Sequence, residues 1–114
     1  MEQTIRTMLA KPKIEEIKYG SKLEAAWAEE LRRLEEAEEI LRYYHEPMNL
    51  RLAANTYYRP DFMVIYAVHV EFHEVKGFWR DDARVKIKVA AEKFPEFVFK
   101  VITKKKNQWH EETV

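Results

Sequence analysis

The most informative part of the sequence is YRPDFMVIYAVHVEFHEVK, residues 58–76. It contains two runs of β-branched and aromatic residues, which predict two strands. If Ala67 and Val68 form a tight turn between these strands, Asp61 lies directly opposite Glu74 on one face of the sheet. The rest of that face is apolar and carries Met63, Ile65, Val70 and Phe72.

This face ends in two carboxylates, which repel each other unless a cation lies between them. Lys76 lies one step further along the same face. The opposite face would carry His69, Glu71 and His73, and we expect its histidines to belong to a polar surface.

The composition predicts one cytoplasmic domain of 114 residues. No apolar run approaches the roughly 18 residues of a membrane span, and the N-terminus lacks the apolar region of a signal peptide. The absence of cysteine excludes a disulfide scaffold and a thiolate metal site. We expect residues 1–18 to form an N-terminal arm and residues 104–114 a basic C-terminal tail.

Residues 20–44 are the clearest helix, because their apolar side chains recur at helical spacing. Ser21 is the expected N-cap, and Glu24 completes a capping box. A carboxylate bonded back to the helix start is aimed differently from a metal ligand, so these two roles of Glu24 compete. Residues 47–53 predict a first strand.

Residues 83–94 allow two interpretations. The alternation over residues 85–89 is typical of a strand, but an apolar stripe and a capping aspartate at position 81 or 82 favour a helix. Residues 97–103 predict a last strand parallel to a central one. The predicted order is αβββαβ, an α/β protein with a mixed central sheet flanked by helices.

Charge is divided along the chain. Residues 15–46 hold ten acidic and five basic residues, whereas residues 76–106 hold ten basic and four acidic ones. The second segment could contact a polyanion. Its candidate phosphate contacts are Arg80, Arg84, Lys86, Lys88, Lys104 and Lys105, for which a solvated helix face and a frayed tail are the alternatives. Phe78, Trp79 and Trp109 could stack on DNA, form an interface or complete a satellite core.

Asp61 after Pro60, followed by Glu74-Val75-Lys76, resembles the signature of the PD-(D/E)xK nuclease superfamily. The element order is similar to the core of that superfamily. Residues 19–24 are similar to the helix start of archaeal-type Holliday junction resolvases and small phage-encoded nucleases. Residues 54–57 lack the serine that such resolvases carry before the aspartate.

The resemblance implies a restriction-endonuclease-like core with Mg²⁺, or Mn²⁺ in its place, and hard cations of this kind take oxygen ligands. The implied ligands are Asp61, Glu74, the Val75 carbonyl and Glu24. Lys76 would orient or deprotonate the attacking water, or neutralise charge on the phosphorane.

The implied function is a metal-dependent endodeoxyribonuclease. The best match is a phage-encoded or cellular Holliday junction resolvase that acts as a homodimer and makes paired nicks in four-way junctions. No membrane and no organic cofactor are expected. Two alternatives stay open. One is a nuclease of the same chemistry with a restriction, repair or replication-fork target. The other is a non-catalytic DNA-binding module.

Overall fold

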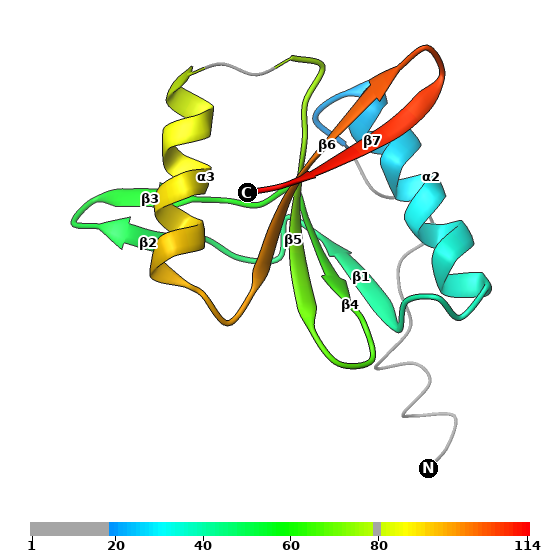
Figure 1. The fold of residues 1–114 in the computed structure, drawn as a ribbon, viewed down its shortest axis with the longest axis horizontal. Helices are drawn as coiled ribbons and strands as arrows, with labels where there is room; N and C mark the ends of the chain where they lie inside the picture. Colours follow the sequence, from blue (N-terminus) through cyan, green and yellow to red (C-terminus); the bar gives the residue numbers. More distant parts are fainter. Residues whose placement is uncertain (1–18, 79–80) are drawn as a thin grey trace.

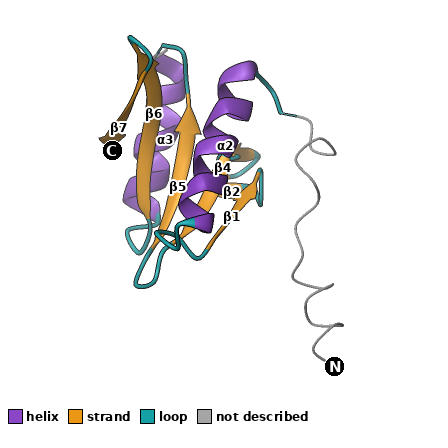
Figure 2. Ribbon diagram, turned by 90° about the vertical axis from the view of Figure 1, so that its right-hand side faces the viewer, coloured by secondary structure: helices purple, strands orange, loops and turns teal. Residues whose placement is uncertain are grey.

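The structure is a computed structural model that describes residues 19–78 and 81–114. A five-stranded mixed sheet has one helix on each face (Figure 1, Figure 2). This confirms the predicted α/β class with a mixed sheet flanked by helices. Within the described ranges, no helix has the length and apolar character needed to cross a membrane. The predicted N-terminal arm, Trp79 and Arg80 lie outside the described residues.

The sheet has the strand order β1-β4-β5-β6-β7, and a separate hairpin is formed by β2 and β3. Among the strands that the structure describes, only β5 and β6 pair in parallel, and α3 lies between them in the chain. The elements in chain order are α2 (Lys22–Glu36), β1 (Arg42–His45), β2 (Leu50–Ala53), β3 (Thr56–Tyr58), β4 (Phe62–Ile65), β5 (Val70–Val75), α3 (Asp81–Lys93), β6 (Val98–Lys105) and β7 (Gln108–Thr113).

The β4–β5 hairpin has the predicted register. Phe62 lies opposite His73, and the Tyr66 N–H donates to the His69 carbonyl at 2.9 Å across the two predicted turn residues. The rings of Tyr66 and His69 stack with their centroids 4.5 Å apart. This contact supports a turn that lacks the residues favouring positive φ.

The predicted helix over residues 20–44 is too long, because α2 ends at Glu36. Glu38 adopts a left-handed conformation with φ of 61°. The following N–H, of Glu39, donates to the Leu34 carbonyl at 2.9 Å. This pattern is a Schellman motif, which usually carries glycine or asparagine at the left-handed position. A glutamate there gave no signal that the helix stops.

The strand predicted over residues 47–53 is present as β2, but it is not the first strand of the chain. The strand beside β4 is β1, whereas the predicted strand over residues 47–53 belongs to the β2–β3 hairpin. That hairpin turns at Asn55, which has φ of 57°, and it lies beside α3 (Figure 1). Without this hairpin, the element order is αβββαβ followed by β7.

The second half of the chain follows the prediction up to residue 103. The ambiguous segment is the helix α3, and β6 runs parallel to β5. The prediction of a basic C-terminal tail is wrong, because residues 108–113 form the strand β7, which pairs with β6. Lys106 and Asn107 both have positive φ, so the two strands are joined by a two-residue turn of the type that favours asparagine.

Apolar side chains cover both faces of the sheet, because strand residues alternate between the faces. The core under α2 contains Trp27, Leu31, Phe62, Val64, Val75 and Ile102. The core under α3 and the β2–β3 hairpin contains Leu50, Leu52, Phe72, Ile87, Phe99 and Val101. Trp109 packs against the first core, in edge contact with Trp27 at 4.9 Å, which confirms the satellite-core alternative for this side chain.

The polar surface predicted for His69 and His73 is therefore wrong for His73, which is buried under α2. His73 Nδ1 accepts a hydrogen bond from the Trp27 indole N–H at 3.1 Å. His73 Nε2 must then carry the proton and donate to Glu71, 2.9 Å away. Glu71 is also buried and pairs with Lys100, while His69 is half-buried. Helix α2 covers this face, which hairpin alternation alone could not reveal.

Candidate functional site

The β4–β5 register brings Asp61 and Glu74 to the open end of the hairpin. Asp61 directly precedes β4, and its Oδ2 accepts a hydrogen bond from the Val75 N–H at 2.8 Å. Its carboxylate is thus fixed to the backbone of β5, beside the Glu74 side chain. Local strand pairing therefore produces the predicted pair of carboxylates.

The two carboxylates have raised pKa values. Burial, followed by repulsion from Glu74 and Glu24, raises the pKa of Asp61 to about 7, although the Val75 N–H opposes this. Burial also raises the pKa of Glu74, against a hydrogen bond from Tyr58 and the charge of Lys76. The raised pKa values mean that the two carboxylates have too little positive charge nearby to stabilise their ionised forms. This is expected of carboxylates that bind a cation.

Glu74 has a defined partner on each oxygen. The Tyr58 hydroxyl donates to Oε1 at 2.8 Å, and the Lys76 ammonium lies 3.2 Å from Oε2. Burial and the neighbouring Glu74 raise the pKa of Tyr58, so its hydroxyl keeps the proton that it donates. Lys76 is more exposed than Glu74, at 38% against 9% of the side chain. The ammonium thus stands between the buried carboxylate and solvent.

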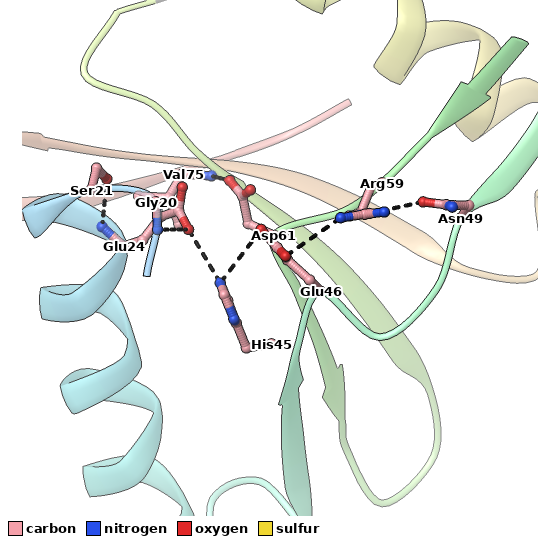
Figure 3. A network of polar contacts seen from close by, with 9 residues as sticks. All are labelled: Gly20, Ser21, Glu24, His45, Glu46, Asn49, Arg59, Asp61 and Val75. Carbon is pink, nitrogen blue, oxygen red and sulfur yellow. Dashed lines mark hydrogen bonds and ion pairs between the residues drawn. The ribbon is translucent and has the colours of Figure 1, made fainter. Parts of the chain in front are cut away.

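Glu24 caps the helix and also faces the site. Its N–H donates to Ser21 Oγ at 3.0 Å, as predicted, but its Oε2 accepts from the Gly20 N–H at 3.3 Å. A Cβ at Gly20 would lie 3.0 Å from Glu24 Oε1, so the glycine leaves room for this carboxylate. The same Oε2 lies 3.3 Å from His45 Nε2 (Figure 3). Glu24 therefore takes part in capping the helix while the same carboxylate faces His45, and its role as a metal ligand stays a prediction.

Glu24, His45 and Glu46 form a cluster that could hold a metal ion. Each contributes one ligand atom, and these atoms lie within 4.8 Å of one another. His45 Nε2 is also 3.8 Å from Glu46 Oε1 (Figure 3). In the part of the chain that the structure describes, no other group of three acidic or histidine side chains closes this tightly. Asp61 and Glu74 interact with Glu24 through charge but stand outside this cluster.

A cleft of about 290 Å³ opens beside Glu74 and Lys76, between the end of β3 and the start of α3. Its remaining lining includes two tyrosines, two basic residues and one acidic residue: Tyr57, Tyr58, Arg59, Lys86 and Asp82. Arg59 also connects the cleft to the cluster, since its Nη1 lies 3.6 Å from Glu46 Oε2.

The structure separates the predicted phosphate contacts. Lys86 lines the cleft, while Arg84 and Lys88 are exposed on α3 but are not part of its lining. Lys104 lies over the Trp109 ring at 4.9 Å. Lys105 is the exposed last residue of β6, and the turn between β6 and β7 lies away from α3 (Figure 1).

Sequence reasoning missed Tyr57, Tyr58, His45 and Glu46. The predicted helix ran through residue 44, so His45 and Glu46 were not placed near Asp61. Strand alternation could have put Tyr57 and Tyr58 on opposite sides of a strand. It could not have brought Tyr58 to Glu74, because β3 belongs to a different sheet.

The raised pKa of Asp61 predicts a pH effect on the metal-free protein. The pKa of Asp61 is about 7 in the folded protein, above the ordinary value of 3.8. Protonated Asp61 therefore adds to the free energy of unfolding, fully below about pH 4, and this addition is lost as pH rises through about 7. The loss is at most about 4 kcal/mol. Urea unfolding in EDTA from about pH 5 to about pH 8 should show it. Asp61→Asn should flatten this dependence, and an equal slope in wild type and variant would contradict the prediction.

A comparison with known protein families shows which family the chain belongs to. The family described as "Protein of unknown function (DUF1064)" matches residues 8–109, most of the chain. No curated protein and no solved structure matches the chain.

Proposed function

Because the chain belongs to the DUF1064 family, whose function is unknown, we propose its activity from its own site: it is a metal-dependent endonuclease that hydrolyses phosphodiester bonds in DNA. The observation that carries the proposal is the arrangement of Asp61, Glu74 and Lys76. The half-buried Asp61 and the buried Glu74, both with raised pKa values, lie at the open end of one hairpin, and the ammonium of Lys76, directly after β5, borders an open cleft.

The chemistry of these side chains suits a divalent cation, because carboxylate oxygens are the ligands that hard cations prefer. Asp61 and Glu74 would hold it, with Glu24 and the Val75 carbonyl as further oxygen ligands. His45 offers an imidazole nitrogen beside Glu24, so Mn²⁺ should support activity at least as well as Mg²⁺. When bound, such a cation supplies Lewis acidity to the scissile phosphate and acidifies a water.

The chain's own groups would orient the reactants. Tyr58 fixes the Glu74 carboxylate through Oε1, which leaves Oε2 facing Lys76. In the cleft, the Lys76 ammonium could hold the attacking water or stabilise negative charge that develops on the phosphate oxygens. Arg59 and Lys86 line the same cleft and would position the flanking phosphates.

The finer assignment to branched DNA and to a homodimer is supported by the resemblance to Holliday junction resolvases. A chain of 114 residues would also need a second copy to place two sites on opposed strands. A nuclease of the same chemistry acting on another DNA form is the alternative. The cytoplasm, of a bacterium, an archaeon or a phage host, remains the proposed location.

A cleavage assay tests the proposal. Labelled four-way junction, forked DNA and linear duplex are incubated with the protein and Mg²⁺, Mn²⁺ or EDTA. We expect cutting of branched DNA with either metal, none in EDTA, and none by Asp61→Ala. Failure of the wild type to cut any DNA with either metal would refute the nuclease proposal and leave a binding module. Equal cutting of linear duplex would keep the chemistry and remove the branched substrate.

A further inference from the structure

The position of Glu74 restricts how a DNA strand can reach it. Its side chain is only 9% exposed and lines the cleft between two walls. One wall is the end of β3 with Tyr57 and Arg59, and the other is the first turns of α3 with Asp82 and Lys86. A scissile phosphate would therefore approach Glu74 through this cleft.

Tyr57 places an aromatic ring at the mouth of this cleft. It alternates with the buried Tyr58 along β3, so one tyrosine points to Glu74 while the other is 49% exposed. The Tyr57 carbonyl accepts a hydrogen bond from Lys86 Nζ at 3.4 Å, so a cation is held against the backbone of this residue. Arg51, opposite Tyr57 in the hairpin register, adds another exposed cation.

Arg59 completes this arrangement and is held in place from two directions. Its Nε donates to Asn49 Oδ1 at 2.9 Å, and its Nη1 approaches Glu46 at 3.6 Å. Binding sites for single-stranded nucleic acid combine an exposed aromatic ring with positively charged side chains along the nucleic-acid backbone. There the ring stacks on a base and the cations contact phosphates.

A base in a duplex offers no free face to such a ring, since both faces are stacked on neighbouring bases. The cleft volume of about 290 Å³ is at the lower end for ligand pockets and suits one small unit of a polymer. We propose that Tyr57, Arg59 and Lys86 form a binding site for an unpaired nucleotide, so that a single DNA strand enters the cleft. The inference rests on the proposed function and, among branched DNA, favours a flap or fork with an unpaired strand over a fully paired four-way junction.

The test is fluorescence anisotropy in EDTA, which separates binding from cleavage. The probes are a labelled oligo-dT of about 12 nucleotides and a duplex of equal length. We expect the wild type to bind oligo-dT more tightly. Tyr57→Ala should weaken oligo-dT binding about 5- to 100-fold, the loss of one stacked base, with little change for duplex. Tyr57→Phe should bind like the wild type, because it keeps the ring.

Tyr44→Ala is the matched control. Tyr44 is also an exposed tyrosine beside a cation, with Arg42 5.4 Å from its ring centroid, but it lies on β1 and not in the cleft. It should leave both affinities unchanged. Tighter binding of duplex by the wild type, or equal losses for both probes in Tyr57→Ala, would overturn the inference.

Parallel cleavage with Mn²⁺ separates the two proposals. If the wild type cuts DNA but Tyr57→Ala binds oligo-dT as tightly as the wild type, the inference is overturned and the nuclease proposal stands. Binding that depends on Tyr57 without any cutting would support the nucleotide site and refute the nuclease.

Discussion

Lys76→Ala is expected to slow metal-dependent cleavage by about 10²- to 10⁴-fold, the usual contribution of a positioned proton-transfer or charge-stabilising group. The ammonium is 3.2 Å from Glu74 Oε2 and lines the cleft, so its loss removes a positive charge where the phosphate must lie. Its partial exposure means that the fold should persist. Single-turnover cleavage of the best substrate at saturating Mn²⁺ measures this effect, because saturation offsets any loss of metal affinity.

Lys88→Ala is the control for this experiment. Lys88 is an exposed cation on α3 that does not line the cleft. Its removal should change the rate only through general attraction of DNA, and that effect should vanish at higher salt. If Lys76→Ala and Lys88→Ala reduced the rate equally, and salt removed both effects, Lys76 would be an electrostatic contact with no role in the chemistry.

Sequence reasoning succeeded where structure is local. The β4–β5 register followed from β-branched runs on either side of a two-residue turn, and it placed Asp61 beside β5. Helix α3 followed from its apolar stripe in preference to a competing alternation over five residues. Both predictions needed only neighbours within about twenty positions.

Sequence reasoning failed where a helix ends at a residue type that rarely takes the left-handed conformation. It also failed where an element distant in the sequence covers a surface. Glu38 ends α2 in a left-handed conformation that glycine or asparagine usually occupies, so β1 was read as helix. His73 looked like surface because Trp27, its hydrogen-bond donor, is 46 positions away. Tyr58 reaches Glu74 from a separate hairpin. The carboxylates were therefore predicted, and their partners were not.

The buried network under α2 leads to the second large effect. Glu71 is 4% exposed and accepts from His73 Nε2–H, while the Lys100 ammonium lies 3.2 Å away. Burial alone would raise the pKa of Glu71, but the hydrogen bonds from His73 and His69 and the nearby positive charge of Lys100 together outweigh it and lower the pKa to about 2. The carboxylate is thus ionised inside the protein and depends on its partners to remain so.

Glu71→Gln should lower the free energy of unfolding by about 3–5 kcal/mol at neutral pH, because it breaks a buried charge pair without changing side-chain volume. The folded pKa lies below the ordinary value of 4.5. The stabilisation is therefore present above about pH 5 and is lost as pH falls towards 2. Urea unfolding of wild type and variant at several pH values should show curves that converge in acid.

Glu111→Gln is the control that separates the loss of a buried charge pair from the loss of an exposed one. Glu111 lies 3.2 Å from the same Lys100 ammonium, yet its side chain is 43% exposed. A surface pair of this kind contributes about 0–1 kcal/mol, so this variant should unfold almost like the wild type. Equal destabilisation by both substitutions would mean that Lys100 pairing alone matters. In that case the hydrogen bonds that connect Glu71 to His73 and Trp27 would add nothing to the stability of the fold.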